Sequence, residues 1–512
     1  MDRRWGMALL AALLAVATVV FVSGCGGDSA SGSSEREFGG TGLPGVDAAS
    51  TRFVEGEIER SNASSLEVAW KLPLTAQSTY GAYTATPVIV KGVVYSQDLK
   101  SNVQAIDLGN GEVIWNKKFE IPDQGPNGVA VAAGKVFGAT SSEAFALDQE
   151  TGKQVWKVDL IGNPAEAIDI APGYHEGLVY VSTVPTNVSS EYPAGGVGTL
   201  YALDAETGKE KWHFDTVPKG LWGNPQVNSG GGLWYPPSFD EQGFMYFGVG
   251  NPAPFAGVEG EPWGSSRPGP NLYTNSMVKL DAKTGKMQWY YQQTAHDVYD
   301  WDFQNSPILT EADGRKMAIG SGKSGIVVAL DRKTGKPIWK RPVGRHNGHD
   351  EDGRLAMRGE YSKLRPGSTV YPGTLGGVIA PIAADATTVF APVVNHPITS
   401  DGVQIQETPE LTGELVAIDI ETGEVEWGAE FEAAAFGAPT VVNDLVFLAT
   451  FDGTVHAFDV ETGGEVWQGT LPASSNAGLM ASGDTLVVPA GLPTQEGQQP
   501  QIVAYRLGGE QE

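Results

Sequence analysis

The sequence predicts an all-β protein, an eight-bladed β-propeller with Trp-docking motifs that is closed by pairing of its N- and C-terminal strands. Seven segments share one pattern, in which an apolar run ends in Asp, Gly follows four residues later and Trp follows eight residues later. The segments are Asp107/Gly111/Trp115, Asp148/Gly152/Trp156, Asp204/Gly208/Trp212, Asp281/Gly285/Trp289, Asp331/Gly335/Trp339, Asp419/Gly423/Trp427 and Asp459/Gly463/Trp467. A motif kept at fixed offsets along the chain is typical of a repeat architecture.

Each repeat is predicted to be a β-hairpin. Apolar residues alternate on both sides of a tight turn, Gly supplies a positive φ, and Asp can accept hydrogen bonds from the turn amides. One hairpin is too small to bury both of its faces. We therefore expect each Trp to pack on the neighbouring unit and to donate its indole N–H to a backbone carbonyl.

The two ends of the chain are predicted to share an eighth unit. A Trp-containing segment, residues 67–70, lies early in the chain, and an apolar segment, residues 502–507, lies last. Pairing these two segments would remove the exposed edges of an open array of sheets. We expect a single domain over residues 50–510; an open solenoid is the alternative, but it requires polar capping repeats.

The N-terminus has the features of an export signal. Arg3 and Arg4 precede an apolar run at residues 7–22, which is shorter than the roughly 20 residues of a membrane span. The ending Val-Ser-Gly-Cys resembles the lipobox of bacterial lipoproteins, which implies removal of residues 1–24, lipidation of Cys25 and an extracytoplasmic location on the cell membrane. Residues 25–49 are expected to form a flexible tether. The alternative is an uncleaved anchor with a free Cys.

Charge and Cys content exclude several classes of function. The chain carries 34 basic and 61 acidic residues, a net charge of −27, which argues against nucleic-acid binding. A single Cys rules out an intramolecular disulfide, a thiolate metal cluster and a C-x-x-C-H haem attachment in this sequence.

The repeats resemble those of the pyrroloquinoline quinone (PQQ) enzyme family. This resemblance implies a propeller fold, but propellers with the same repeat also exist without a cofactor, including a lipoprotein that assists outer-membrane protein assembly. The segments between the repeats favour an enzyme, because a bare scaffold does not need clusters of polar residues there.

The first of these segments runs from His296 to Asp302 and resembles the H-D-x-W-D-x-D stretch of PQQ alcohol dehydrogenases, with Tyr299 in place of Trp. Its three carboxylates repel one another when desolvated unless a cation or a proton compensates. In an extended segment Asp300 and Asp302 would lie on one face. The resemblance implies that Asp300 is the catalytic base and a metal ligand, and that Asp302 is the carboxylate associated with a lanthanide ion rather than Ca²⁺.

Two further segments match the family. Gly248–Pro254 resembles its G-x-G-N-P-A-P stretch, which implies that the Asn251 amide oxygen joins a hard cation. Trp234 follows a run of three glycines, and the resemblance makes it the flat surface on which the quinone stacks. Taken alone, a turn and a core Trp would explain both segments.

Lys323 and Asn395 are the remaining cofactor-binding candidates, and both rest on the resemblance. Glu191 is the candidate for the metal-binding Glu, although it lies two positions from the place where the family has it. Thr84 and Asn127 depart from the family, which has an acidic residue and an Arg at these positions. A tri-anionic cofactor would miss that Arg.

These features predict a PQQ-dependent oxidoreductase with Ca²⁺ or a lanthanide ion. Its substrate would be a small alcohol or a sugar hydroxyl. Because no haem motif is present, electrons would pass to an external acceptor, a cytochrome c or a membrane quinone. The alternative is a non-catalytic propeller that acts as a scaffold in envelope protein assembly. His346 and His349 are expected to form a surface loop pair.

Overall fold

The protein is all-β in the parts of the chain that the computed structural model describes, residues 42–186 and 194–508. Helical structure in these parts is limited to α1 (Asp352–Met357) and two 3-10 turns, η1 (Ala63–Ser65) and η2 (Tyr361–Lys363). No helix within these two ranges has the length and apolar character to cross a membrane. The predicted signal peptide and Cys25 lie outside the described residues.

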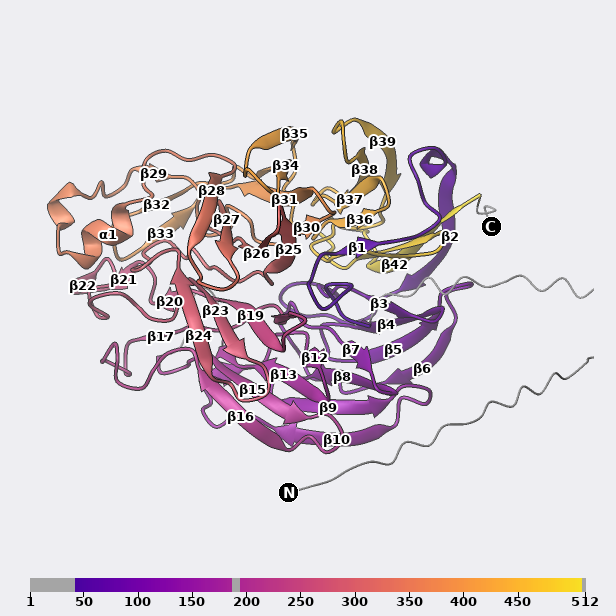
Figure 1. Cartoon of the computed structure of the whole chain (residues 1–512), viewed down its shortest axis with the longest axis horizontal. Coiled ribbons are helices and arrows are strands. Elements are labelled where there is room, and N and C mark those ends of the chain that lie inside the picture. Colours follow the sequence, from indigo (N-terminus) through magenta and orange to yellow (C-terminus); the bar gives the residue numbers. More distant parts are fainter. Residues whose placement is uncertain (1–41, 187–193, 509–512) are drawn as a thin grey trace, which may run out of the picture. The chain divides into compact units, whose positions relative to one another are not determined.

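Eight sheets of four or five strands make up most of the described chain. In chain order, their strands are β3 (Val88–Val90), β4 (Val93–Gln97), β5 (Val103–Asp107), β6 (Val113–Lys117); β7 (Ala130–Ala132), β8 (Lys135–Ala139), β9 (Glu143–Asp148), β10 (Gln154–Asp159); β12 (Gly173–His175), β13 (Leu178–Ser182), β15 (Thr199–Asp204), β16 (Glu210–Asp215); β18 (Ser238–Phe239), β19 (Phe244–Val249), β23 (Ser276–Asp281), β24 (Met287–Gln292); β25 (Ile308–Ala312), β26 (Arg315–Gly320), β27 (Ile326–Asp331), β28 (Pro337–Pro342); β30 (Ala383–Ala384), β31 (Thr388–Asn395), β34 (Thr412–Asp419), β35 (Val425–Phe431); β36 (Thr440–Val442), β37 (Leu445–Ala449), β38 (Thr454–Asp459), β39 (Glu465–Thr470); and β2 (Leu66–Pro73), β42 (Gln501–Leu507), β41 (Thr485–Ala490), β40 (Met480–Ser482). Figure 1 shows these sheets following one another in chain order around a common centre.

Shorter strands form smaller sheets between the eight. They are β11 (Glu166–Ala167) with β14 (Val184–Pro185), β17 (Ser229–Gly230) with β20 (Pro252–Ala253), β21 (Gly257–Val258) with β22 (Glu261–Pro262), and β29 (Thr369–Val370) with β32 (Ile398–Ser400) and β33 (Ile405–Glu407). β1 (Phe53–Val54) adds to β36 as a parallel strand.

The first and last long strands of the chain pair as the sequence predicts. β2 pairs antiparallel with β42, and Leu72 lies opposite Ile502. The sheet that contains both chain ends therefore has β2 as one edge and β40 as the other.

The repeat motif forms the predicted hairpin turn. In the turn between β15 and β16, Asp204 Oδ1 accepts hydrogen bonds from the Thr207 amide at 2.9 Å and from the Thr207 hydroxyl at 2.8 Å. Gly208 follows with φ +71°. A residue with a Cβ is disfavoured at this φ, so the Gly of the motif is required by the backbone.

Each turn Gly also lies under the Trp of the preceding repeat. A Cβ on Gly208 would stand 2.7 Å from Cε3 of Trp156, closer than packing allows. The same contact recurs between Trp70 and Gly111, Trp115 and Gly152, Trp212 and Gly285, Trp289 and Gly335, Trp339 and Gly423, and Trp427 and Gly463. The Trp156 indole donates to the Ala205 carbonyl at 3.0 Å, so one side chain joins two sheets by packing and by a hydrogen bond.

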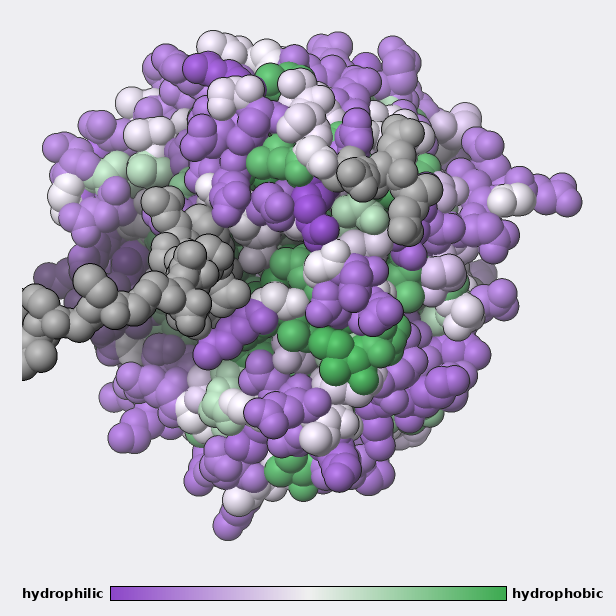
Figure 2. Space-filling model, turned by 90° about the vertical axis from the view of Figure 1, so that its right-hand side faces the viewer, coloured by the Kyte–Doolittle hydropathy of each residue, from purple (hydrophilic) through white to green (hydrophobic). Residues whose placement is uncertain are grey.

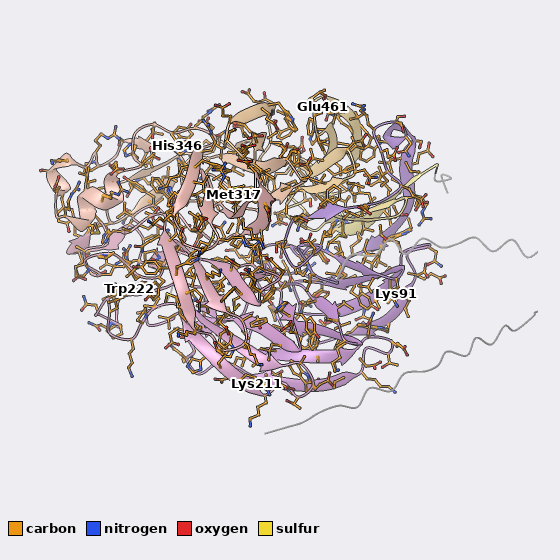
Figure 3. The ribbon with its side chains drawn as sticks, viewed as in Figure 1. Lys91, Lys211, Trp222, Met317, His346 and Glu461 are labelled. Atoms are coloured by element: carbon orange, nitrogen blue, oxygen red, sulfur yellow. The ribbon has the colours of Figure 1, made fainter. Side chains whose placement is uncertain are left out.

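Strands inside a sheet, such as β31 and β41, are buried at every position, whereas the edge strand β16 carries only exposed and partly exposed side chains. Met317 on β26 is fully buried, whereas Lys211 points away from the protein in Figure 3. The face in Figure 2 is covered mainly by hydrophilic residues, with smaller hydrophobic areas among them.

An irregular N-terminal segment, residues 42–54, lies along the inner strands of several sheets. The carbonyls of Gly42, Ala48, Ala49 and Thr51 accept hydrogen bonds from backbone amides within β7, β18, β25 and β30. The flexible tether predicted for residues 25–49 therefore does not include residues 42–49. Arg52 is 2% exposed and donates to three backbone carbonyls and one hydroxyl, and burial lowers its pKa to about 10.

Trp156→Phe and Trp212→Phe form a matched pair that separates the hydrogen bond from the packing. Both indoles lie on a turn Gly, but the buried Trp212 Nε1 has no hydrogen-bond partner. We expect Trp156→Phe to lower the free energy of unfolding by about 1–3 kcal/mol more than Trp212→Phe, because it leaves the Ala205 carbonyl unpaired. Urea unfolding followed by circular dichroism measures the difference, and equal losses would show that the hydrogen bond adds nothing.

Candidate active site and central cavity

The loop between β24 and β25, residues 293–307, carries the predicted catalytic carboxylate. Asp297 shapes this loop, since its carboxylate accepts hydrogen bonds from the Tyr299 amide at 2.9 Å and the Trp301 amide at 2.6 Å. The buried Arg267 donates to the Asp297 carbonyl at 2.7 Å. The backbone at Asp300 takes a left-handed conformation with φ +65°. The extended segment that the sequence predicts here is therefore wrong at Asp300.

Asp300 and Asp302 nevertheless share one site because both face Lys323. The Lys323 Nζ lies 2.8 Å from Asp300 Oδ2 and 2.6 Å from Asp302 Oδ2. Burial raises the pKa of Asp300 well above its usual value, Lys323 opposes this rise, and the charge of Asp302 adds to it. Asp300 Oδ1 is buried and has no hydrogen-bond partner.

Asn251 and Trp234 adjoin the same cluster. Asp302 Oδ1 accepts a hydrogen bond from the Asn251 backbone amide at 2.6 Å. A Cβ on the neighbouring Gly250 would stand 2.7 Å from Asp302 Oδ1 and 3.0 Å from Trp234 Nε1. Gly250 therefore lets Trp234 and Asp302 approach each other. The structure brings five of the predicted site residues into one neighbourhood.

The side chain of Asn395 makes its hydrogen bonds outside this cluster. Asn395 is buried and uses its side chain elsewhere, accepting from the Arg345 amide at 2.8 Å and donating to Glu414 at 2.5 Å. Glu191 and Cys25 lie outside the described residues. Within residues 42–186 and 194–508, no group of three or more His, Cys, Asp or Glu side chains surrounds a possible metal position.

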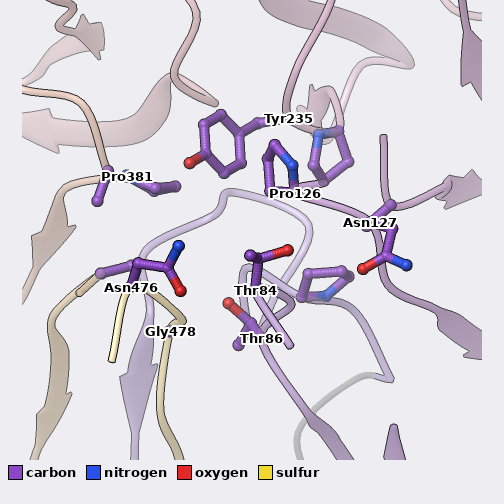
Figure 4. Close-up of a pocket in the computed structure, with 13 residues that line it drawn as sticks. Thr84, Thr86, Pro126, Asn127, Tyr235, Pro381, Asn476 and Gly478 are labelled. Carbon is purple, nitrogen blue, oxygen red and sulfur yellow. The ribbon is translucent and has the colours of Figure 1, made fainter. Parts of the chain in front are cut away.

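A cavity of about 360 Å³, its open mouth included, lies beside the cluster. Figure 4 shows Thr84, Thr86, Asn127, Tyr235 and Asn476 around it. Its walls come from the residues that precede the first strand of most of the eight sheets, and Pro44 of the N-terminal segment also lines it.

Tyr235 connects the cavity to the carboxylate cluster. Burial raises the pKa of the Tyr235 hydroxyl, Arg52 and Lys323 oppose this rise, and Asp302 adds to it. The Tyr235 hydroxyl therefore lies within the electrostatic reach of both Lys323 and Asp302, so the cluster lies near one wall of the cavity.

Sequence reasoning missed two buried groups. Asp123 and Asp169 are each 3% exposed and interact with each other behind the cavity wall formed by Pro126, Asn127 and Ala171. No sequence motif marks either residue.

The second missed group surrounds His349. The sequence places His349 on a surface loop, but it is 1% exposed, and its Nδ1 lies 2.6 Å from Asp352 Oδ2. Tyr299 also donates to this carboxylate oxygen at 2.6 Å. The segment after β28 is thereby held against the loop that carries Asp300.

The repeated sheets and the buried carboxylate–lysine cluster define a β-propeller protein with a candidate catalytic site beside its central cavity. Comparison with known families is consistent with this class. The profile described as "Glucose/ethanol/alcohol dehydrogenase, beta-propeller domain" matches residues 44–136 and 169–352. A second profile, described as "Outer membrane protein assembly factor BamB", matches residues 99–230 and 391–506.

Curated relatives cover most of the chain. Quinohemoprotein alcohol dehydrogenase of Comamonas testosteroni is 30% identical over 540 residues, which span 91% of this chain and 72% of the relative. The putative dehydrogenase XoxF of Paracoccus denitrificans is 27% identical over 522 residues, which span 85% of this chain and 83% of the relative. The chain belongs to the PQQ family of glucose, ethanol and alcohol dehydrogenase propellers.

Solved structures show the same fold. The quinohemoprotein alcohol dehydrogenase of Comamonas testosteroni has a TM-score of 0.80 at 24% identity, covering 94% of this chain and 82% of that one. A europium-containing methanol dehydrogenase has a TM-score of 0.76 at 21% identity, covering 92% of this chain and 99% of that one. BamB of Moraxella catarrhalis gives 0.53 at 15% identity, covering 87% and 99%.

Lys323→Met tests the charge balance of the cluster. We expect it to lower stability at pH 7 by about 3–5 kcal/mol, because two buried carboxylates lose their shared ammonium. A carboxyl whose pKa is raised in the folded state keeps its proton up to a higher pH than it does in the unfolded chain. The free energy of unfolding therefore falls as pH rises above about 4. The loss should therefore be smaller at pH 5 than at pH 7.

Lys279→Met is the matched control. Lys279 is also buried, but its Nζ donates to the Arg332 carbonyl at 2.9 Å and lies over the Phe244 ring. Removing it should not change the pH dependence of stability. Urea unfolding at pH 5 and pH 7 measures the free energy of unfolding of both variants. If Lys323→Met and Lys279→Met show the same change in stability between the two pH values, Lys323 is not the compensating charge.

Proposed function

We propose that this protein is a PQQ-dependent oxidoreductase that oxidises an alcohol or sugar hydroxyl and passes the electrons to an external acceptor. The observation that carries the proposal is the convergence of Lys323, Asp300 and Asp302 beside Trp234. The names of the relatives, which are quinone-dependent alcohol dehydrogenases, support the same reaction class.

The residues around Trp234 fit the quinone end of such a cofactor. An indole offers a flat surface for stacking, and the Lys323 ammonium can stabilise negative charge on a quinone oxygen. PQQ would supply the hydride acceptor. The opposite end of the cavity fits less well, because Asn127 and Thr84 stand where the resemblance places charged residues.

Asp300 is suited to take the proton of the substrate hydroxyl. Its Oδ2 is held by Lys323, whereas its Oδ1 has no partner and remains able to accept a proton. The raised pKa moves this carboxyl closer to neutral pH, where a general base is most effective. The left-handed backbone held by Asp297 fixes the direction of the side chain.

A hard cation is proposed as the second cofactor at this site, with Asn251, Asp300, Asp302 and Glu191 as its ligands. Carboxylate and amide oxygens suit Ca²⁺ and the chemically similar lanthanide ions. The ion would compete with Lys323 for the charge of the two aspartates.

We propose that the eight sheets are the blades of one closed eight-bladed propeller and that the Trp-to-Gly contacts dock neighbouring blades. The antiparallel pairing of β2 with β42 and the seven recurring contacts support this description.

A lipid at Cys25 is proposed to anchor the protein outside the cytoplasm. The lipobox-like sequence and the acidic surface support this proposal, because an acidic protein gains little from binding an anionic bilayer directly. A soluble cytochrome c or a membrane quinone would then be within reach as the electron acceptor.

A second candidate function is a non-catalytic scaffold in envelope protein assembly. The match to the assembly-factor profile over residues 99–230 and 391–506 favours it, as does the neutral character of Thr84 and Asn127. On this hypothesis the polar cavity would hold no quinone.

Reconstitution with PQQ and a metal ion distinguishes the enzyme hypothesis from the scaffold hypothesis. We expect the purified protein to take up PQQ in the presence of Ca²⁺ or La³⁺, to show the absorbance of the bound quinone and to reduce a dye when an alcohol is added. If neither ion yields a bound chromophore, the enzyme hypothesis fails and the scaffold remains.

Asp300→Asn should keep the bound cofactor and lower turnover by about 100-fold or more, because the amide cannot take the substrate proton. Asp313→Asn, at an exposed turn between β25 and β26, is the control and should keep full activity. Quinone absorbance measures occupancy, and dye reduction measures turnover. Undiminished turnover in Asp300→Asn would remove Asp300 from its role.

A further inference from the structure

Two buried carboxyl groups outside the carboxylate–lysine cluster face each other behind the wall of the central cavity. Asp123 Oδ1 accepts hydrogen bonds from the Gln124 amide at 2.7 Å and the Gly125 amide at 3.2 Å, and the Asp169 carboxyl interacts directly with that of Asp123. Two ionised carboxylates have no hydrogen to share. A proton or a cation must therefore lie between them.

The described chain supplies no basic side chain for this pair. Burial raises the pKa of both carboxyls, the charge of Asp123 raises that of Asp169 further, and neither a Lys nor an Arg acts on them. This arrangement differs from the cluster at Asp300 and Asp302, where Lys323 supplies the positive charge.

Oxygen atoms that lack hydrogen-bond partners occur on Asp123 itself and on the neighbouring cavity wall. Asp123 Oδ2, Asn127 Oδ1 and Thr84 Oγ1 are all buried, and none has a partner. Gly125 lies among them, because its amide donates to Asp123 and a Cβ on it would stand 2.1 Å from Thr84 Oγ1. A shared proton would satisfy one contact between the carboxyls and leave the other acceptors unpaired.

We propose that Asp123 and Asp169 bind a hard cation, Ca²⁺ or a trivalent lanthanide, with the side-chain oxygens of Asn127 and Thr84 as further ligands. Carboxylate, amide and hydroxyl oxygens are the donors that such ions prefer. The ion would neutralise the two carboxylates, and a trivalent ion would leave one net positive charge at the end of the cavity where Asn127 supplies none, so that a ligand carboxylate could bind there. The cation site itself does not depend on the proposed function.

Terbium luminescence tests the proposal without PQQ. The purified full chain, stripped of metal, is titrated with Tb³⁺ at pH 7 alongside Asp169→Asn and Asp302→Asn. We expect Asp169→Asn to lose one bound Tb³⁺ per chain and Asp302→Asn to retain that ion, and Ca²⁺ in excess should displace the ion from the wild type.

Three results would overturn the cation site: no Tb³⁺ bound by the wild type, unchanged binding by Asp169→Asn, or loss confined to Asp302→Asn. The last of these would assign the ion to the cluster at Lys323 instead. If Asp169→Asn does not fold, Asp123→Asn takes its place in the titration, and circular dichroism verifies that this variant is folded. If no metal binds and infrared spectra show a protonated carboxyl that Asp169→Asn removes, the pair holds a proton.

Discussion

The contact between a Trp indole and the turn Gly of the next repeat is the constraint on which the rest of the structure depends. The Gly has a positive φ that the hairpin needs, and its lack of a Cβ leaves room for the indole, as at Gly208 and Trp156. One residue therefore couples the local turn to the packing of neighbouring sheets. Seven such contacts link a Trp to the turn Gly of the next repeat, and on our proposal they dock neighbouring blades and so position the loops that carry the polar site residues.

The fold was predictable because the residues that determine it form a short local motif that recurs along the chain. Asp, Gly and Trp recur at fixed offsets, and the pairing of β2 with β42 follows from the need to remove sheet edges. The N-terminal segment was not predictable in the same way. Apart from the buried Arg52 side chain, residues 42–52 attach to the sheets mainly through backbone carbonyls, which any sequence possesses, so their side-chain pattern does not distinguish them from a tether.

The candidate site was predictable only where a motif marks it. Asp300, Asp302 and Asn251 stand in recognisable segments, and Lys323 joins them in space. Local alternation gave the wrong backbone at Asp300, because the hydrogen bonds of Asp297 override an extended conformation. Asp123 and Asp169 lie in different loops, one before β7 and one before β12, and only the tertiary fold reveals that they meet.

The two carboxylate groups show the same physical requirement met in different ways. Burial penalises a charged carboxylate by more than a surface pair can return, so each group needs positive charge or a proton at close range. At Asp300 and Asp302 the chain provides Lys323 for that purpose. At Asp123 and Asp169 the chain provides oxygen atoms in place of a basic residue. Oxygen atoms stabilise a buried carboxylate pair only when a cation or a proton lies between these oxygens and the carboxylates. The two carboxylate pairs therefore differ in what balances their charge. The pair without a basic residue is the one at the end of the cavity where the chain departs furthest from its family.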